Sequence, residues 1–304
     1  MVEIKNKVEP IGKDKKIVLI GPMAAGKTTF KRVFFEDANP LQLVNCSIEP
    51  TRGIENKAYR YFSQTIAVWD LAGQELDNWL GERSDVFQES TVIVCMLSAS
   101  LSLKDNLLFL IKFLKKKMEI APESVLFILL NKCDLLNDVE SYNMILSIEQ
   151  YVQAKHPEFS GFCKRTDIYR TSIMDTYFMR TLTVAYKIIE ICMEKSAFQV
   201  TPEQIKEIRV KMKVLLAFSM KEWYTIADIA SKIKGKTPEI QGYLEELHAR
   251  GYLLKQKESF FSISEKGQHF ALAYKKQAAI ARTKKMMESI GFFLTLNEGM
   301  EKLG

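Results

Sequence analysis

The amino-acid sequence predicts an α/β protein, in which a domain with a mainly parallel sheet is followed by a smaller α+β domain. Short, largely apolar runs recur along the first part of the chain, and amphipathic helical patterns lie between them. This alternation is typical of a parallel sheet that is covered by helices on both faces. A change in charge near residue 200 indicates where the second domain begins.

The length and composition are those of a globular protein with two domains. The 304 residues are 47% hydrophobic and 26% charged, which excludes a disordered or collagen-like chain. No run of about 18 uncharged apolar residues occurs, so we expect no membrane-spanning helix. The polar N-terminus lacks the apolar core of a signal peptide. The five cysteines are scattered without a C-x-x-C pair, so we expect reduced thiols in the cytoplasm instead of disulfides or a zinc site.

The net charge of +6 resides entirely in the last part of the chain. Residues 1–200 hold 25 Lys or Arg and 25 Asp or Glu, whereas residues 201–304 hold 18 and 12. This charge raises nucleic acid or an anionic surface as a partner of the second part. We predict four segments: a polar N-terminal tail over 1–14, a first domain over 15–198, a second domain over 201–276, and a C-terminal helix and tail over 277–304.

Five strands are predicted in the first domain, and they cover residues 16–20, 65–71, 91–97, 125–130 and 168–172. Helices are predicted between them. Residues 103–118 place leucines and isoleucine on one face with lysines opposite, and residues 176–193 repeat this design. Ligands of parallel sheets bind at the carboxyl ends of the strands. Site residues are therefore expected directly after these runs.

The first run leads into GPMAAGKTT at residues 21–29, which fits the pattern G-x-x-x-x-G-K-S/T. Backbone N–H groups of such a loop can surround a phosphate, helped by the N-terminal end of the following helix. Lys27 would reach the β- and γ-phosphates, and the Thr28 hydroxyl would bind Mg²⁺. The predicted phosphate site comprises Met23, Ala24, Ala25, Gly26, Lys27, Thr28 and Thr29. A glycine turn that matches by chance is disfavoured by the strand before it and the helix after it.

The run over 65–71 ends in the sequence WDLAGQE, with an acidic residue at the end of a buried strand. Asp70 at this place can hold Mg²⁺ through water. Gly73 would let the loop bring its backbone N–H to a γ-phosphate, and Gln74 can then orient an attacking water. The tetrapeptide D-x-x-G often marks a simple turn. Its place at a strand end, 43 residues after Lys27, favours a phosphate site instead.

The fourth run ends in Asn131-Lys132-Cys133-Asp134. The Asp134 carboxylate can accept from N1–H and N2–H₂ of guanine, whereas adenine offers no such pair of donors on that edge. Lys132 would lay its methylene stem along the base, and Asn131 would tie the loops together. After the last short strand, backbone N–H groups at Ser172 and Ile173 could bind the guanine O6. A polar turn that caps the next helix is the alternative for this motif.

Taken in order, GPMAAGKTT, WDLAGQE, NKCD and TSI resemble the motifs of the Ras superfamily of small GTPases, over about residues 15–196. The resemblance implies a P-loop GTPase domain that binds GTP or GDP with Mg²⁺ and hydrolyses GTP. RTSIMD at residues 170–175 and the segment 83–97 resemble the Rag/Gtr GTPases, whereas AAGKTT at 24–29 and PTRG at 50–53 resemble Arf proteins. We favour the Rag/Gtr branch, although Asn131 stands where Rag proteins typically have histidine.

The resemblance also implies roles that the motifs alone do not. Thr51 matches the loop threonine that coordinates Mg²⁺ and senses the γ-phosphate; an ordinary turn threonine is the alternative. The expected metal ligands are thus Thr28, Thr51 and Asp70, and the expected catalytic residues are Lys27, Thr51 and Gln74. Met23 stands where Ras proteins have a glycine that leaves room for the catalytic glutamine, so it can slow hydrolysis.

Partners are expected to be proteins: effectors, a GTPase activator and an exchange factor, with a homo- or heterodimer left open. No intrinsic membrane anchor is expected, because Val2 replaces the glycine that N-myristoylation needs and no cysteine follows Cys192.

The second domain resembles a winged-helix domain. Helices are predicted over 202–221, 225–235 and 237–250, followed by a hairpin of strands over 252–255 and 260–263. A further helix is predicted from Glu265 to Ser289. The third helix carries Glu239, Glu245 and Glu246, which phosphates would repel, so a protein partner is favoured and DNA is unlikely.

Three functions therefore remain in competition. The first is an Mg²⁺-dependent GTPase switch in which GTP orders residues 38–54 and 71–84. The second is a scaffold that binds GTP or GDP with negligible hydrolysis, which Met23 favours. The third is a nucleotide-controlled DNA-binding regulator, which Glu245 and Glu246 disfavour.

Overall fold

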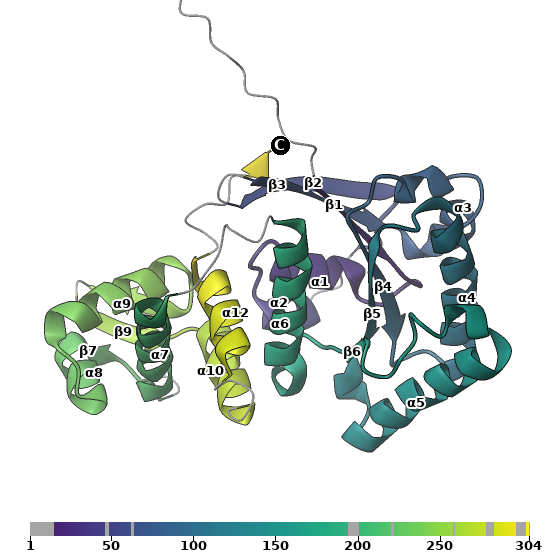
Figure 1. The fold of residues 1–304 in the computed structure, drawn as a ribbon. Helices are drawn as coiled ribbons and strands as arrows, with labels where there is room; N and C mark the ends of the chain where they lie inside the picture. Colours follow the sequence, from purple (N-terminus) through teal and green to yellow (C-terminus); the bar gives the residue numbers. More distant parts are fainter. Residues whose placement is uncertain are drawn as a thin grey trace, which may run out of the picture.

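A computed structural model of the chain describes residues 15–45, 49–61, 64–193, 201–219, 222–257, 259–277, 283–295 and 302–303 (Figure 1). The predicted tail over 1–14 lies outside the described residues, as do Cys46 and most of the predicted C-terminal tail. Within the described ranges, no helix combines the length and apolar character needed to span a bilayer.

A seven-stranded sheet with the order β10-β2-β3-β1-β4-β5-β6 organises the first part of the chain. Five of its strands run parallel, namely β1 (Lys15–Ile20), β3 (Gln64–Leu71), β4 (Val92–Ser98), β5 (Val125–Asn131) and β6 (Ile168–Arg170). The strand β2 (Ile54–Tyr61) pairs antiparallel with β3, and β10 (Lys302–Leu303) pairs antiparallel with β2. The mainly parallel sheet confirms the predicted α/β class.

Helices cover both faces of this sheet (Figure 1). One face carries α1 (Lys27–Phe34), α2 (Pro40–Asn45) and α6 (Asp175–Cys192), and the other carries α3 (Leu76–Trp79), α4 (Leu103–Ile120) and α5 (Asp138–Lys155). Single 3₁₀ turns lie at Gly73–Glu75, Ser84–Phe87, Cys133–Leu135 and Pro157–Phe159. The core strand β4 is buried along its whole length, because a strand with a helical layer on each side has no solvent face.

The remaining elements form a helical unit with a small antiparallel sheet of order β7-β9-β8. In chain order they are α7 (Pro202–Ala217), β7 (Tyr224–Thr225), α8 (Ile226–Ile233), α9 (Thr237–Ala249), β8 (Leu253–Gln256), β9 (Phe260–Ile263), α10 (Glu265–Lys276) and α12 (Lys284–Thr295). Three helices followed by a hairpin are the elements that the sequence predicts here. The helix α7 ends at Ala217, before the predicted end at Lys221, because Phe218 has extended backbone angles.

The single helix predicted from Glu265 to Ser289 is wrong, since α10 and α12 are separate helices. The backbone of Gln277 leaves the helical region with φ −108° and ψ 26°. Its side-chain amide donates to the carbonyls of Asp175 and Thr176, at 3.0 and 2.7 Å. A contact about 100 residues away in sequence thus accompanies the end of α10, and no local pattern encodes it.

The two parts of the chain share one hydrophobic core, because α6 is buried on the sheet side and also against α10 and α12. Phe178 of α6 lies edge-on to His269 and Phe270 of α10, with ring centroids 4.8 and 5.9 Å away. Tyr186, two turns further along α6, contacts Phe292 of α12 at 5.3 Å. The helical unit is therefore attached by packing and not only by the connecting chain.

Candidate functional site

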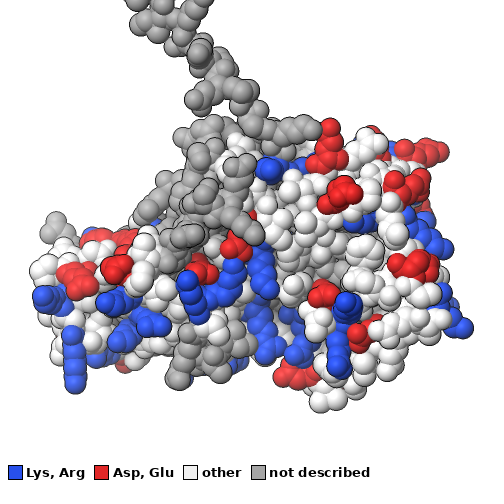
Figure 2. All heavy atoms as spheres, in the orientation of Figure 1, with Lys and Arg blue, Asp and Glu red and all other residues white. Residues whose placement is uncertain are grey.

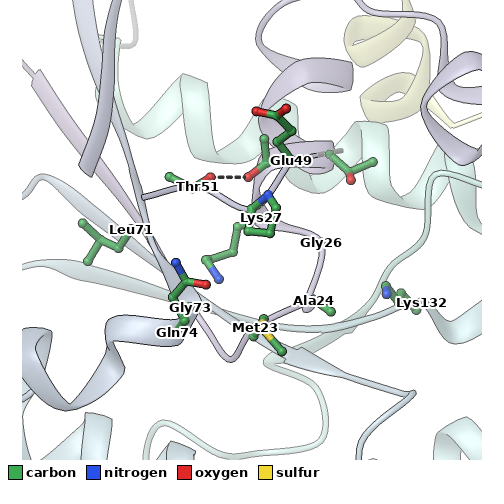
Figure 3. Close-up of a pocket in the computed structure, with 13 residues that line it drawn as sticks. Met23, Ala24, Gly26, Lys27, Glu49, Thr51, Leu71, Gly73, Gln74 and Lys132 are labelled. Atoms are coloured by element: carbon green, nitrogen blue, oxygen red, sulfur yellow. Dashed lines mark hydrogen bonds between the residues drawn. The ribbon is translucent and has the colours of Figure 1, made fainter. Parts of the chain in front are cut away.

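A cavity of about 340 Å³ opens at the carboxyl ends of β1 and β3 (Figure 3). Its walls come from the loop between β1 and α1, the segment before β2, the loop after β3, and one residue after β5. The lining residues are Met23, Ala24, Gly26, Lys27, Thr28, Thr29, Glu49, Pro50, Thr51, Leu71, Gly73, Gln74 and Lys132. Most of the residues predicted from the phosphate motifs therefore meet in one place.

Two glycines allow the loop between β1 and α1 to take its tight path. A Cβ at Gly21 would overlap the carbonyl oxygen of Met96 on the neighbouring strand. Gly26 has φ +91°, a left-handed conformation, and a Cβ there would lie 2.5 Å from Nδ2 of Asn131. The loop is thus pressed against the sheet and against Asn131, the first residue of the Asn131–Asp134 motif.

Lys27 is the buried cation of the cavity. Its Nζ donates to the carbonyl oxygens of Gly21 and Pro22, at 2.8 and 3.0 Å. Burial lowers its pKa to about 8, and the nearby Asp70 carboxylate opposes that shift. An ammonium has three donors, so a third remains for an anionic ligand in the cavity. A phosphate there would also favour the charged form of the lysine.

Thr28, Thr51 and Asp70 converge from three different elements. The Thr28 hydroxyl donates to Oδ2 of Asp70 at 2.6 Å, and the hydroxyls of Thr28 and Thr51 lie 2.9 Å apart, which is the dashed contact in Figure 3. Thr51 is also 3.4 Å from the same carboxylate oxygen. Asp70 is fully buried, and burial raises its pKa while the Thr28 hydrogen bond opposes the rise.

This cluster fits a hard divalent cation. Among the described residues, Oδ1 of Asp70 is buried without a hydrogen-bond partner, which a cation or its water would supply. One carboxylate and two hydroxyls are oxygen ligands of the kind that Mg²⁺ accepts, and Mg²⁺ completes its shell with water and substrate phosphates. Thr28, Thr51 and Asp70 are therefore the residues that would hold it.

The loop after β3 lies directly on the phosphate loop. A Cβ at Gly73 would lie 2.6 Å from the backbone nitrogen of Met23, so this close approach requires glycine. Gln74 is exposed at the rim beside Met23, whose side chain is 61% exposed (Figure 3). Glu75, which sequence analysis missed, accepts from the Gly53 N–H at 2.8 Å and so joins this loop to the segment that carries Thr51.

Asn131 connects the base motif to the phosphate loop. Its Nδ2 donates to the carbonyl of Ala25 at 2.8 Å, and its Oδ1 accepts from the Thr171 hydroxyl at 3.2 Å. Asp134 is exposed and accepts from the Ser172 hydroxyl, beyond the walls of the cavity. A base would lie on the side of the cavity where Asn131 and Asp134 are found, and Lys132 lines the cavity on that side.

The structure differs from the prediction at Ser172. Its backbone N–H donates to the Thr181 hydroxyl of α6 at 3.0 Å, so it is not directed at a ligand. Its hydroxyl instead holds Asp134 and accepts from the Met174 N–H at 2.9 Å. Ile173 packs its side chain against the core, and its backbone forms a hydrogen bond with the buried His269 of α10.

Sequence analysis also missed Lys31 and Glu55 beside Asp70. The Lys31 Nζ is 2.7 Å from Oε1 of Glu55 and 3.9 Å from Oδ2 of Asp70, and Lys31 is completely buried. A lysine one turn after the phosphate loop gives no sequence signal of burial, because lysines on amphipathic helices usually face solvent.

Comparisons with known proteins show the family to which this chain belongs. Residues 16–236 match the model of the Gtr1/RagA G protein conserved region, well over half of the chain. None of the curated proteins matches the chain. One similar solved structure is that of Methanosarcina barkeri Roco2 RocCORdC bound to GDP, at 16% identity over 91% of this chain and 82% of that chain, with a TM-score of 0.38. The family match confirms the favoured Rag/Gtr branch, and the chain belongs to the Gtr1/RagA family of GTP-binding G proteins.

Proposed function

We propose that this protein is an Mg²⁺-dependent switch that hydrolyses GTP to GDP and phosphate and signals to protein partners through its loops. The observation that supports this most directly is that Thr28 and Thr51 line the cavity beside Lys27 and that both contact the buried carboxylate of Asp70. Thr51 lies in the segment 38–54 and Gln74 in the segment 71–84, so both segments have a residue at the γ-phosphate side of the proposed site. Loss of that phosphate would release them together.

In this proposal the residues of the site bind the nucleotide and Mg²⁺ and orient the attacking water. Lys27 and the N–H groups of the phosphate loop bind the β- and γ-phosphates, and Asp134 selects guanine. Thr28, Thr51 and Asp70 hold Mg²⁺, which when bound neutralises charge on the phosphate oxygens. Gly73 brings its N–H to the γ-phosphate, and Gln74 orients the attacking water.

The reaction is expected to be slow without an activator. Among the described residues, no arginine lines the cavity. Arg83 is stacked over the Trp79 ring at 4.6 Å, and Arg52 is exposed at the other loop. Charge stabilisation by an arginine would therefore have to come from a partner, which fits a GTPase activator. The exposed Met23 at the rim lies where such a partner would enter.

We predict an intrinsic rate at or below about 10⁻³ s⁻¹, by comparison with about 3–5 × 10⁻⁴ s⁻¹ for Ras, which is the reference example of an unaided rate. Gln74→Leu should lower the rate by about tenfold or more while leaving GTP affinity within about twofold, because the glutamine acts on water and not on the nucleotide. The measurement is single-turnover hydrolysis of GTP by the full chain, with the nucleotide retained after purification identified first.

Gln153→Leu, at an exposed position of α5, is the matched control and should hydrolyse at the unmutated rate. If the unmutated protein retains GTP over many hours without hydrolysis, the scaffold function replaces the switch. A measurable rate that Gln74→Leu leaves unchanged would remove Gln74 from the mechanism.

We further propose that residues 15–198 form the GTPase domain and residues 201–276 a winged-helix module that docks proteins. Its third helix, α9, carries glutamates that are already paired: Glu245 with Lys255 at 2.7 Å, and Glu246 with Lys211 at 2.7 Å. These pairs also neutralise both lysines, and Lys211 is itself buried. On the face drawn in Figure 2, this part of the molecule carries both acidic and basic side chains.

The protein is therefore expected to bind duplex DNA only in the non-specific range, about 10⁻⁴–10⁻⁶ M at physiological salt. The measurement is titration of labelled duplexes of varied sequence with the full chain, in the GDP and the GTP form. Affinity should fall steeply with salt and be the same for all duplexes. A nanomolar, sequence-selective complex would favour the DNA-binding regulator instead.

A further inference from the structure

Lys31 occupies an unusual place for a lysine, because it is buried beside Asp70 in the cluster proposed to hold Mg²⁺. It lies one helical turn after Lys27 on α1 and is 0% exposed. Burying an ammonium is costly unless anionic partners compensate for the lost hydration. The partners here are two carboxylates, Glu55 of β2 at 2.7 Å and Asp70 of β3 at 3.9 Å. One cation therefore joins three elements of the core.

The two carboxylates are not equivalent. Glu55 and Asp70 are direct neighbours in the pairing of β2 with β3, so a small shift of the Lys31 ammonium exchanges one for the other. Glu55 is 34% exposed and has a second cation, Lys57, at 3.6 Å. Asp70 is fully buried, and Lys31 approaches the same oxygen, Oδ2, that accepts the Thr28 hydrogen bond.

Glu55 is also coupled to the loop that carries Thr51. It lies four residues after Thr51 at the start of β2, where the Ala72 N–H donates to the Gly53 carbonyl at 2.9 Å. A movement of this segment would change the distance between Glu55 and the Lys31 ammonium. The position of β2 therefore influences how much of the lysine charge acts on Asp70.

We propose that Lys31 is a positioning residue that competes with Mg²⁺ for Asp70 and is restrained by Glu55. This inference rests on the proposed function, because it concerns the Mg²⁺ that the site would hold. When Glu55 holds the Lys31 ammonium, Asp70 is free to bind Mg²⁺. When the start of β2 moves away, the ammonium turns to Asp70 and weakens Mg²⁺ binding. The pair thus sets the Mg²⁺ concentration at which nucleotide is retained.

The proposal predicts opposite effects for the two partners. Lys31→Met removes the competing charge and should lower the Mg²⁺ midpoint of nucleotide retention, by about tenfold. Glu55→Gln removes the restraint and should raise the midpoint by a similar factor. The double variant should behave like Lys31→Met, because Glu55 acts only through the lysine. Tenfold is the effect of a coupling of about 1.4 kcal/mol, which is modest for a close charge pair.

The experiment uses the full chain loaded with fluorescent GDP. Release is started with excess unlabelled GDP, and its rate is measured at a series of free Mg²⁺ concentrations. Lys57→Met is the matched control, because Lys57 is the other cation beside Glu55 but does not form an ion pair with Asp70. This variant should shift the Mg²⁺ midpoint by less than about twofold. Lys31→Arg keeps the charge and should stay close to the unmutated midpoint.

Each outcome bears on one proposal. If GDP is not retained, or Mg²⁺ does not slow its release from the unmutated chain, the proposed function fails. If Mg²⁺ slows release but Lys31→Met and Glu55→Gln keep the unmutated midpoint, or both raise it, Lys31 is only a structural ion pair and the inference is overturned. If Lys31→Met does not fold, Glu55→Gln still tests the inference, because Glu55 is only partly buried. An unchanged or lowered Mg²⁺ midpoint in Glu55→Gln contradicts the inference.

Discussion

Asp134→Asn is expected to lower affinity for GTP and GDP by about 10²–10³-fold and to make xanthine nucleotides the preferred ligands. The aspartate carboxylate would accept two hydrogen bonds from the guanine edge. Hydrogen bonds to charged groups contribute about 1.5–3 kcal/mol each, so losing the pair costs about 3 kcal/mol or more, which is at least about two powers of ten in affinity. An amide can instead donate to the 2-oxo group of xanthine. The Ser172 hydroxyl, which donates to Asp134, would hold the new side chain in place.

The measurement is competition of GDP, XDP and ADP against a fluorescent nucleotide. Asp138→Asn is the matched control, because Asp138 is also an exposed acid after β5 but pairs with Arg170 at 3.1 Å and Tyr177 at 2.8 Å. This control should keep the preference for guanine. Equal affinity of the unmutated protein for ADP and GDP would contradict the assignment of Asp134.

Lys27→Met is expected to lower affinity for GTP and GDP by about 10²–10³-fold. The methionine keeps the buried volume and removes the cation that would hold the phosphates, both through its charge and through a charge-assisted hydrogen bond from its remaining donor. Lys132→Met is the matched control, since the same substitution at a second lysine of the cavity keeps the methylene stem proposed to lie on the base. Its affinity should stay within about fivefold of the unmutated protein, as measured by calorimetry.

The same lysine predicts how binding depends on pH. Burial lowers the pKa of Lys27 to about 8, so the free protein loses this proton as pH rises through that value. A bound polyphosphate favours the charged form, so binding above pH 8 must take up a proton. Affinity should therefore fall between about pH 8 and 10 in the unmutated protein. The pH slope should be absent in Lys27→Met, and an equal slope in both would mean that another group titrates.

The sequence by itself determined the fold class and pointed to most of the residues that line the cavity. Parallel strands can be recognised as apolar runs, and the phosphate loop, Asp70, Gly73 and the Asn131–Asp134 motif each lie at or directly after the end of one of them. These signals are local: glycine spacing and a charged residue at a strand end depend on a few neighbouring residues. The first three helices and the hairpin of the helical unit could be predicted for the same reason, whereas the division of the last predicted helix into α10 and α12 could not.

Only the tertiary structure decided which polar groups meet. It ends α10 at Gln277 through a contact with the start of α6, and it turns the Ser172 N–H toward Thr181 instead of a ligand. It also buries Lys31 between Glu55 and Asp70, residues 24 and 39 positions further along the chain. A lysine is stable inside a protein only when carboxylates from other elements compensate for its lost hydration, and no local periodicity can record where those carboxylates will lie.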